Sequence, residues 1–151
     1  MGSSRGQQQV ATLFEKSVES YLSDQLHAPD GKRTFLTESE QLSEMRAGTR
    51  PRGPTPDILF LQPIQINGQK VKWMDAKLCY ASATYATNKK VPNGKLCKIA
   101  QRYNDYFGGK GAFIFGQSYC IDLRRIVKEA LLLDASPLDM TAVNDFQNAA
   151  K

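Results

Sequence analysis

The segment from Pro54 to Tyr80, PTPDILFLQPIQINGQKVKWMDAKLCY, decides the fold of this chain. Two runs rich in apolar residues flank Asn67-Gly68, the dipeptide that most readily supplies the two positive φ angles of a type I′ turn. The segment therefore predicts a β-hairpin with a two-residue turn. Both outer ends of the hairpin carry charged residues. Asp57 follows a proline at the start of the first strand, and the triplet Asp75 to Lys77 ends the second strand.

The register of this hairpin decides whether its charged residues can act together. A strict two-residue turn pairs residues whose numbers add up to 135, which sets Asp75 opposite Phe60. Asp57 and Asp75 would then point to opposite faces of the sheet, because successive side chains of a strand alternate. Pro63 has no N–H for a regular ladder, so we expect a bulge or ladder break at residues 61–64. That break would bring the two carboxylates within about 6 Å of each other, a span that one oxygen-liganded ion can bridge.

The rest of the chain predicts an α/β domain with a mixed central sheet flanked by helices. The expected order is helix, strand, strand, strand, helix, strand, strand, helix. Helices are expected at residues 10–26, 95–107 and 123–133, and strands at 34–36, on both sides of the turn, and within 111–123. We interpret residues 37–56 as a helical turn followed by a basic loop. Residues 1–9 are expected to be disordered, 10–135 to form the domain, and 136–151 to form a tail.

The composition is that of a single globular domain with an uneven charge. The 151 residues are 41% hydrophobic and 23% charged, enough for one core. The net charge is +5, and residues 77–110 hold seven basic residues against one acid, which suits an anionic partner. Three dispersed cysteines and one histidine argue against a zinc site, and no apolar run approaches membrane-spanning length. These features predict an intracellular chain with no membrane partner.

The two aspartates and the lysine suggest a chemistry for the hairpin. Two carboxylates brought together repel each other unless a cation lies between them, and Mg²⁺ binds oxygen ligands while keeping waters that can attack a phosphate. A lysine beside them can orient that water and stabilise charge on the phosphate. A simpler interpretation is that Asp75 and Lys77 neutralise each other at a sheet edge, as in most Asp-x-Lys triplets.

These residues resemble the PD-(D/E)XK nuclease superfamily, with Pro56-Asp57 as the first half of its motif and the triplet Asp75 to Lys77 as the second. The resemblance implies a restriction-endonuclease-like core. Many members carry a further active-site glutamate on the first helix after a phenylalanine. Glu15 follows Phe14 here and is preferred to Glu19, which lies further toward solvent on a helical wheel.

A narrower resemblance is to the TPD-motif family, named for the Thr-Pro-Asp that stands at residues 55–57. FLTESEQ at 35–41 and QRYNDYFGGKGAFIFG at 101–116 contribute to it, and the similarity runs from about residue 14 to residue 123. It implies a Mg²⁺-dependent endonuclease acting on DNA, with Mn²⁺ as a substitute and Holliday-junction-resolvase-like structure selectivity. It also implies a codanin-like protein partner, a homodimer, and a nuclear or nucleo-cytoplasmic location.

This chain departs from the TPD-motif family in two ways. The family usually has a helical region before the nuclease core that a chain of this length cannot hold, so we expect a shortened or minimal member. The second motif often has glutamate where Asp75 stands. The alternative function is a catalytically silent nuclease fold that binds DNA or a codanin-like partner.

The resemblance assigns roles to individual residues. Asp57, Asp75 and the Ala76 carbonyl would hold the metal, Glu15 would complete the set, and Lys77 would assist the water. Gln101 matches a glutamine that some superfamily members place near the metal, although a polar flank beside a core tyrosine is an equally good interpretation. The residues expected to bind nucleic acid are Arg50, Arg52, Lys89, Lys90, Lys95, Lys98 and Arg102. An ordinary solvated face is an equally good interpretation of the cluster from Lys89 to Arg102.

Overall fold

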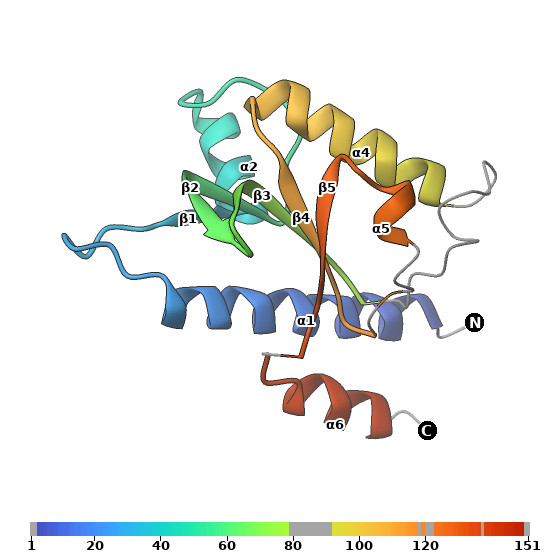
Figure 1. The fold of residues 1–151 in the computed structure, drawn as a ribbon. Helices are drawn as coiled ribbons and strands as arrows, with labels where there is room; N and C mark the ends of the chain where they lie inside the picture. The colour runs from blue at the N-terminus through green and yellow to red at the C-terminus, as the bar shows by residue number, and fades with distance from the viewer. Residues whose placement is uncertain (1–2, 79–91, 118, 120–122, 137, 150–151) are drawn as a thin grey trace.

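A five-stranded mixed sheet forms the centre of the protein, with helices on both faces (Figure 1). The computed structural model describes residues 3–78, 92–117, 119, 123–136 and 138–149. The elements are α1 (Ser3–Gln25), β1 (Phe35–Thr37), α2 (Glu38–Ala47), β2 (Ile58–Ile66), β3 (Gln69–Lys77), α4 (Pro92–Phe107), β4 (Gly111–Phe115), α5 (Leu123–Ile126), β5 (Ala130–Asp134) and α6 (Thr141–Ala149). The strands lie in the order β1-β2-β3-β4-β5. Pairs β1–β2 and β2–β3 are antiparallel, whereas β3–β4 and β4–β5 are parallel, so the expected mixed α/β sheet is confirmed.

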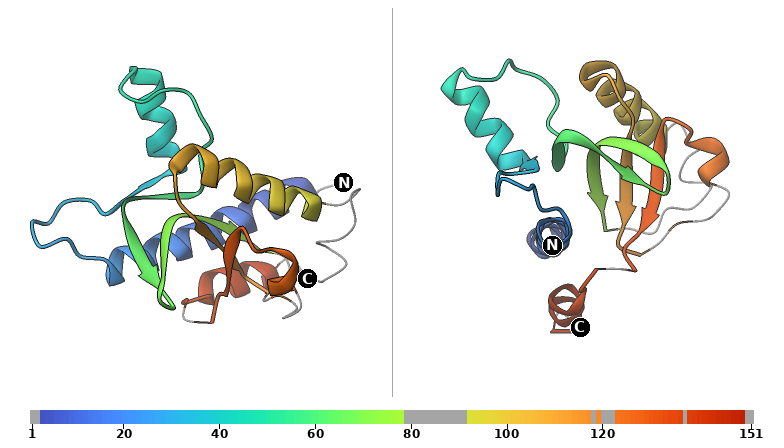
Figure 2. Two further views of the ribbon diagram at one scale, coloured as in Figure 1. Left: turned by 45° about the horizontal axis from the view of Figure 1, so that its top comes forward. Right: turned by 60° about the vertical axis from the view of Figure 1, so that its left-hand side comes forward.

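Two hydrophobic cores lie on opposite faces of the sheet, and the right-hand view of Figure 2 shows α1 and α4 on either side of the strands. On one face, the apolar stripe of α1, including Phe14 and Val18, packs with Val143 of α6 against the sheet. On the other face, Leu96 and Ala100 of α4 pack around the fully buried ring of Trp73. The sheet is therefore the middle layer of three, and the ends of its central strands lie between α1 and α4.

The turn of the hairpin forms as its sequence predicts. Asn67 and Gly68 adopt φ angles of 50° and 76°, the left-handed values that a type I′ turn requires. The pairs nearest the turn, from Ile66 with Gln69 to Ile64 with Val71, follow the regular register.

Further from the turn, the register of the hairpin changes. Ile58 pairs with Met74 and Leu59 with Trp73, so paired residue numbers add up to 132 there instead of 135. Three extra residues of β2 are therefore accommodated between Leu59 and Ile64, the interval that contains Pro63. The expected ladder break is confirmed. Because the register shifts by an odd number of residues, the residues of β2 before the break share a face with different residues of β3 than the regular register would give.

Both ends of the chain are more helical than their sequences predict. Helix α1 begins at Ser3 instead of residue 10, so residues 3–9 are not the disordered segment we expected. Glutamines at positions 7–9 are good helix formers, and they extend the helix that buries Val10. Helix α6 lies inside the expected C-terminal tail, because Val143 and Leu138 complete the core against α1.

The prediction of a helix at residues 123–133 is wrong. The segment forms the four-residue helix α5 and then β5, which pairs in parallel with β4 along its whole length. Ala130 and Leu132 face the α4 core, while Leu131 and Leu133 pack on the α1 side. A strand that is apolar on both faces has no alternation to distinguish it from a buried helix, and here strand pairing overrides the helix propensity of alanine and leucine. Helix α2, which forms nearly three turns after β1, is longer than the helical turn we expected.

Candidate active site at the open end of the hairpin

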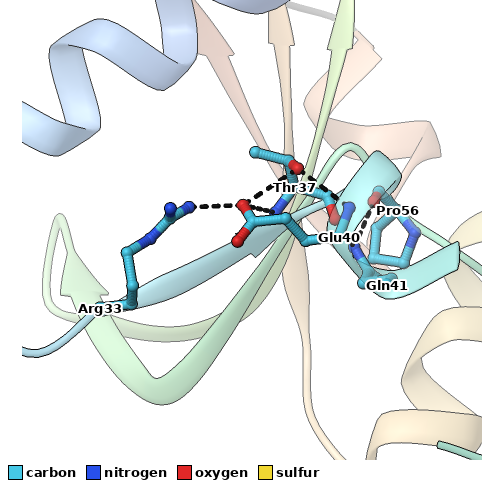
Figure 3. A network of polar contacts seen from close by, with 5 residues as sticks. All are labelled: Arg33, Thr37, Glu40, Gln41 and Pro56. Carbon is cyan, nitrogen blue, oxygen red and sulfur yellow. Dashed lines mark hydrogen bonds and ion pairs between the residues drawn. The ribbon is translucent and has the colours of Figure 1, made fainter. Parts of the chain in front are cut away.

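The first turn of α2 holds the segment that carries Asp57, immediately before β2. The buried amide of Gln41 donates from Nε2 to the carbonyl oxygen of Pro56 at 2.9 Å, and the N–H of Glu38 donates to the carbonyl of Asp57 at 3.2 Å. Figure 3 shows that a capping box between Thr37 and Glu40 forms the same turn. Because a capped helix end is a defined structure, these two bonds fix the backbone on which Asp57 stands.

The shifted register brings the two aspartates together. Continued by one residue beyond Ile58, it sets Asp57 opposite Asp75, so that both side chains share a face. The N–H of Asp57 donates to Asp75 Oδ1 at 2.8 Å, and the N–H of Ala76 donates to Asp57 Oδ2 at 2.8 Å. These reciprocal bonds orient both carboxylates and leave Oδ1 of Asp57 and Oδ2 of Asp75 outside the backbone bonds.

The surroundings of the two carboxylates disfavour their ionised forms. Burial raises the pKa of Asp75, which is only 5% exposed, and the charge of Asp57 raises it further. Burial also raises the pKa of Asp57, although the bond from the Ala76 N–H opposes this effect. The charge of Lys77, which stands two residues after Asp75 on the same strand, lowers the pKa of both aspartates. One lysine therefore compensates the two buried charges only in part.

Helix α1 adds a third carboxylate at the edge of this site. Burial raises the pKa of Glu15 to about 7, and the charges of Asp57, Glu38, Glu19 and Asp75 add to the effect. Burial raises the pKa of Glu19 too, and Asp57 is the only one of the two aspartates that contributes to it. Of the two candidate glutamates on α1, Glu15 is thus the one influenced by both aspartates.

Sequence reasoning missed Glu38, whose pKa is raised by burial and by the charge of Asp57. It is the first residue of α2, and the only sequence signal for its position was the Thr-x-x-Glu capping box that begins this helix.

Tyr103, not Gln101, is the residue that α4 directs at the aspartates. The hydroxyl of Tyr103 donates to Asp75 Oδ2 at 3.3 Å, and the nearby carboxylates raise the pKa of this tyrosine beyond what burial does. Gln101 is exposed and donates to Asp105 on the outer surface of α4 at 3.2 Å. Residues two apart on a helix face different directions, so the expected role of Gln101 beside the metal is not supported by its position.

The described side chains fit only an ion that needs few protein ligands. Among residues 3–78, 92–117, 119, 123–136 and 138–149, no three histidine, cysteine, aspartate or glutamate side chains are grouped as a metal site. Mg²⁺ is commonly held by one or two carboxylates and completes its shell with water. Asp57 and Asp75 satisfy that smaller requirement, and a cation there would relieve the repulsion that raises the pKa of Asp75.

The expected nucleic-acid-binding residues have different surroundings. Arg52, Lys98 and Arg102 line one groove, whereas Arg50 forms an ion pair with Glu44 at 2.7 Å. Lys89 and Lys90 lie outside the described residues, and Lys95 lies in α4 with its side chain outside the described part.

The family profile described as a protein of unknown function with the TPD sequence motif matches residues 4–136, so the chain belongs to that family. No curated protein and no solved structure matches the chain significantly. In the described part of the chain, no helix has the length and apolar character needed to span a membrane.

Proposed function

We propose that this member of the TPD-motif family is a metal-dependent endonuclease domain that hydrolyses phosphodiester bonds in DNA. The observation that carries the proposal is the register change of three residues, which sets Asp57 opposite Asp75 and beside Lys77. In the regular register of the turn, these residues would lie on opposite faces and have no common chemistry.

The order of elements supports a restriction-endonuclease-like core. A helix precedes three antiparallel strands, and a later helix leads to a strand parallel to the third. The first motif half lies immediately before the second strand, and the second half ends the third strand. This is the order that the resemblance to the PD-(D/E)XK superfamily implies. Helix α2 is inserted between the first two strands and holds the first motif half in place.

Asp57 and Asp75 would hold a Mg²⁺ ion, or Mn²⁺ in its place, with the Ala76 carbonyl as a further ligand, whereas Glu15 would lie at the edge of the site without a direct bond to the ion. Their buried, mutually repelling carboxylates support this assignment, because a cation is the group that would stabilise them in ionised form. When bound, such an ion supplies charge stabilisation for a phosphate and lowers the pKa of a bound water.

The chain's own groups supply the remaining functions. The ammonium group of Lys77 would hold the attacking water in line and stabilise negative charge as it builds on the phosphate oxygens. Tyr103 keeps the Asp75 side chain in one orientation through its hydroxyl group. Gln41 and the N–H of Glu38 keep the backbone at Asp57 fixed, so the two carboxylates need little reorganisation.

The test is DNA cleavage with matched aspartate variants. Plain duplex, flapped and four-way-junction DNA are incubated with the wild type in Mg²⁺, in Mn²⁺ and in EDTA, and with Asp75→Asn. The control is Asp30→Asn, since Asp30 is exposed in the loop before β1. We expect cleavage in either metal, none in EDTA, at least about a hundredfold loss for Asp75→Asn, and no change for Asp30→Asn.

Calorimetric titration of Mg²⁺ and Mn²⁺ into the same proteins completes the test. Binding of the metal to the wild type with no cleavage of any substrate would mean a catalytically silent nuclease fold. Absence of both metal binding and cleavage would refute the proposal.

A further inference from the structure

A groove lies beside the candidate active site, between the segment before β2 and the outer surface of α4. One wall is Arg52–Pro54, and the other is formed by Lys98, Gln101, Arg102, Asp105 and Tyr106. The α4 residues span two turns of the helix, about 12 Å along its axis. In Figure 1, the C-terminal half of α4 lies near the connection that leads from α2 to β2.

The charge of the groove favours an anion. Arg52, Lys98 and Arg102 are exposed cations, and Asp105 is the one carboxylate among the lining residues. An oxygen of Asp105 accepts a hydrogen bond from Gln101 at 3.2 Å. The positively charged groups therefore exceed the negative one by two, and an acidic protein segment or a nucleic-acid backbone has the complementary charge.

An aromatic ring distinguishes between these occupants. Tyr106 is 44% exposed, although it is one of the largest hydrophobic side chains. Gly53 lies directly against its ring, because a Cβ atom at Gly53 would clash with Tyr106 Cζ. Phe107 supports the ring edge-to-face with a centroid distance of 4.9 Å. A ring fixed from two sides, with its remaining surface open among cations, suits stacking by a nucleobase.

Both walls of the groove belong to segments that also carry residues of the candidate active site. Pro54 stands three residues before Asp57 on the same segment. Tyr106 stands one helical turn after Tyr103, which contacts Asp75. A strand lying in the groove would therefore approach the two carboxylates at its end.

We propose that this groove binds a single-stranded segment of DNA, with a base stacked on Tyr106 and flanking phosphates held by Arg52, Lys98 and Arg102. Only an unpaired base exposes a face to a side chain, because in a duplex both faces are covered by neighbouring base pairs. The inference rests on the proposed nuclease function and specifies its substrate as DNA with an unpaired segment next to the cleaved bond.

The test measures binding of fluorescently labelled oligonucleotides in EDTA, which prevents cleavage. A single strand and a duplex of equal length are titrated into the wild type, Tyr106→Ala and Tyr106→Phe. We expect Tyr106→Ala to weaken single-strand binding by about 5- to 150-fold, which corresponds to the loss of one stacked base. Duplex binding should change by less than about twofold, and Tyr106→Phe should retain single-strand affinity because the ring remains.

Charge variants test the phosphate contacts. Lys98→Ala and Arg102→Ala should each lower the slope of log affinity against log salt by about 0.7 on single strands. Lys70→Ala is the matched control, since Lys70 is exposed at the turn end of the hairpin. Circular dichroism and thermal melting confirm that every variant is folded.

The outcomes separate this inference from the proposed function. An equal loss for Tyr106→Ala on single strand and duplex, or no loss on either, overturns the single-strand groove even when the wild type cleaves DNA in Mg²⁺. Selective loss on single strands supports the groove even when no substrate is cleaved, and in that case the nuclease proposal alone fails.

Discussion

The two ends of the β2–β3 hairpin pair in different registers. At the turn end, Asn67-Gly68 sets the regular register through Ile64 and Val71, and most side chains there are exposed. At the open end the register is displaced by three residues, and the side chains are buried. The tight turn therefore determines pairing only for the few residues nearest to it.

The displaced register has a visible cause. Residues 61–63 are exposed, and Pro63 has no N–H with which to continue the ladder. On the far side of this break, β2 pairs with β1, where Phe35 faces Phe60 and their rings meet at a centroid distance of 6.4 Å. The first half of β2 is thus aligned by β1 and α2, and the second half by the turn.

The largest expected effect is a loss of DNA cleavage that occurs only when the open end of the hairpin is changed. Lys77→Ala, at the open end of β3, should lower cleavage by about 10²- to 10⁴-fold, the range seen when a group acting in proton transfer or charge stabilisation is lost. Lys70→Ala, at the turn end of the same strand, should leave cleavage unchanged. DNA affinity, measured in EDTA, should stay nearly constant for both. A proportional fall of affinity and cleavage in Lys77→Ala would contradict the catalytic role.

The next effect concerns stability and pH. The pKa of Asp75 is raised in the folded state to about 7 from an ordinary value of 3.8, so folding favours its protonated form. The protonated Asp75 therefore favours the folded state. This stabilisation is fully present below about pH 4 and is lost as the pH rises through about 7. At pH 8 without metal, Asp75→Asn should therefore raise the free energy of unfolding by on the order of 4 kcal/mol, since each pKa unit corresponds to about 1.4 kcal/mol.

Urea denaturation between pH 4 and 8 measures this effect. The wild type should lose stability over that range, in part also through Glu15, and Mg²⁺ should restore it above pH 7. Asp75→Asn should show a flatter pH dependence and a smaller response to Mg²⁺. A variant that is less stable than the wild type at pH 8 in EDTA would show that the buried charge is already well compensated.

A smaller effect tests whether α2 aligns the open end. Gln41→Ala removes the amide that bonds to the carbonyls of Pro56 and Thr37, and it should cost about 2 kcal/mol of stability. Cleavage should fall about tenfold because the backbone at Asp57 becomes less fixed. Leu42→Ala is the neighbouring control on the exposed face of α2. Unchanged cleavage in a destabilised Gln41→Ala would limit Gln41 to a structural role.

The smallest effect belongs to the turn end. Gly68 has a φ angle of 76°, so Gly68→Ala should cost about 1 kcal/mol of stability. Because β1 and α2 align the open end independently of the turn, cleavage and metal affinity should not change. Thermal denaturation and a cleavage assay below the melting range check this pair of expectations. A large loss of cleavage would show that the turn does control the register at Asp57.

Local sequence was sufficient wherever a few neighbouring residues decide the structure. The positive φ angles of Asn67 and Gly68 and the apolar face of α1 are both short-range features. The candidate site residues Asp57, Asp75 and Lys77 were recognisable by type and order, and the missing N–H of Pro63 indicated where the ladder would break.

Only the tertiary structure decided the size of that break and what surrounds the aspartates. Three extra residues are accommodated because β1, not the turn, pairs with Phe60, and no local pattern encodes that choice. Tyr103 and Gln41 reach the site from helices whose packing follows from the whole core. Residues 130–134 form a strand because they pair with β4. Pairing between these distant segments stabilises the strand by more than the local helix propensity favours a helix.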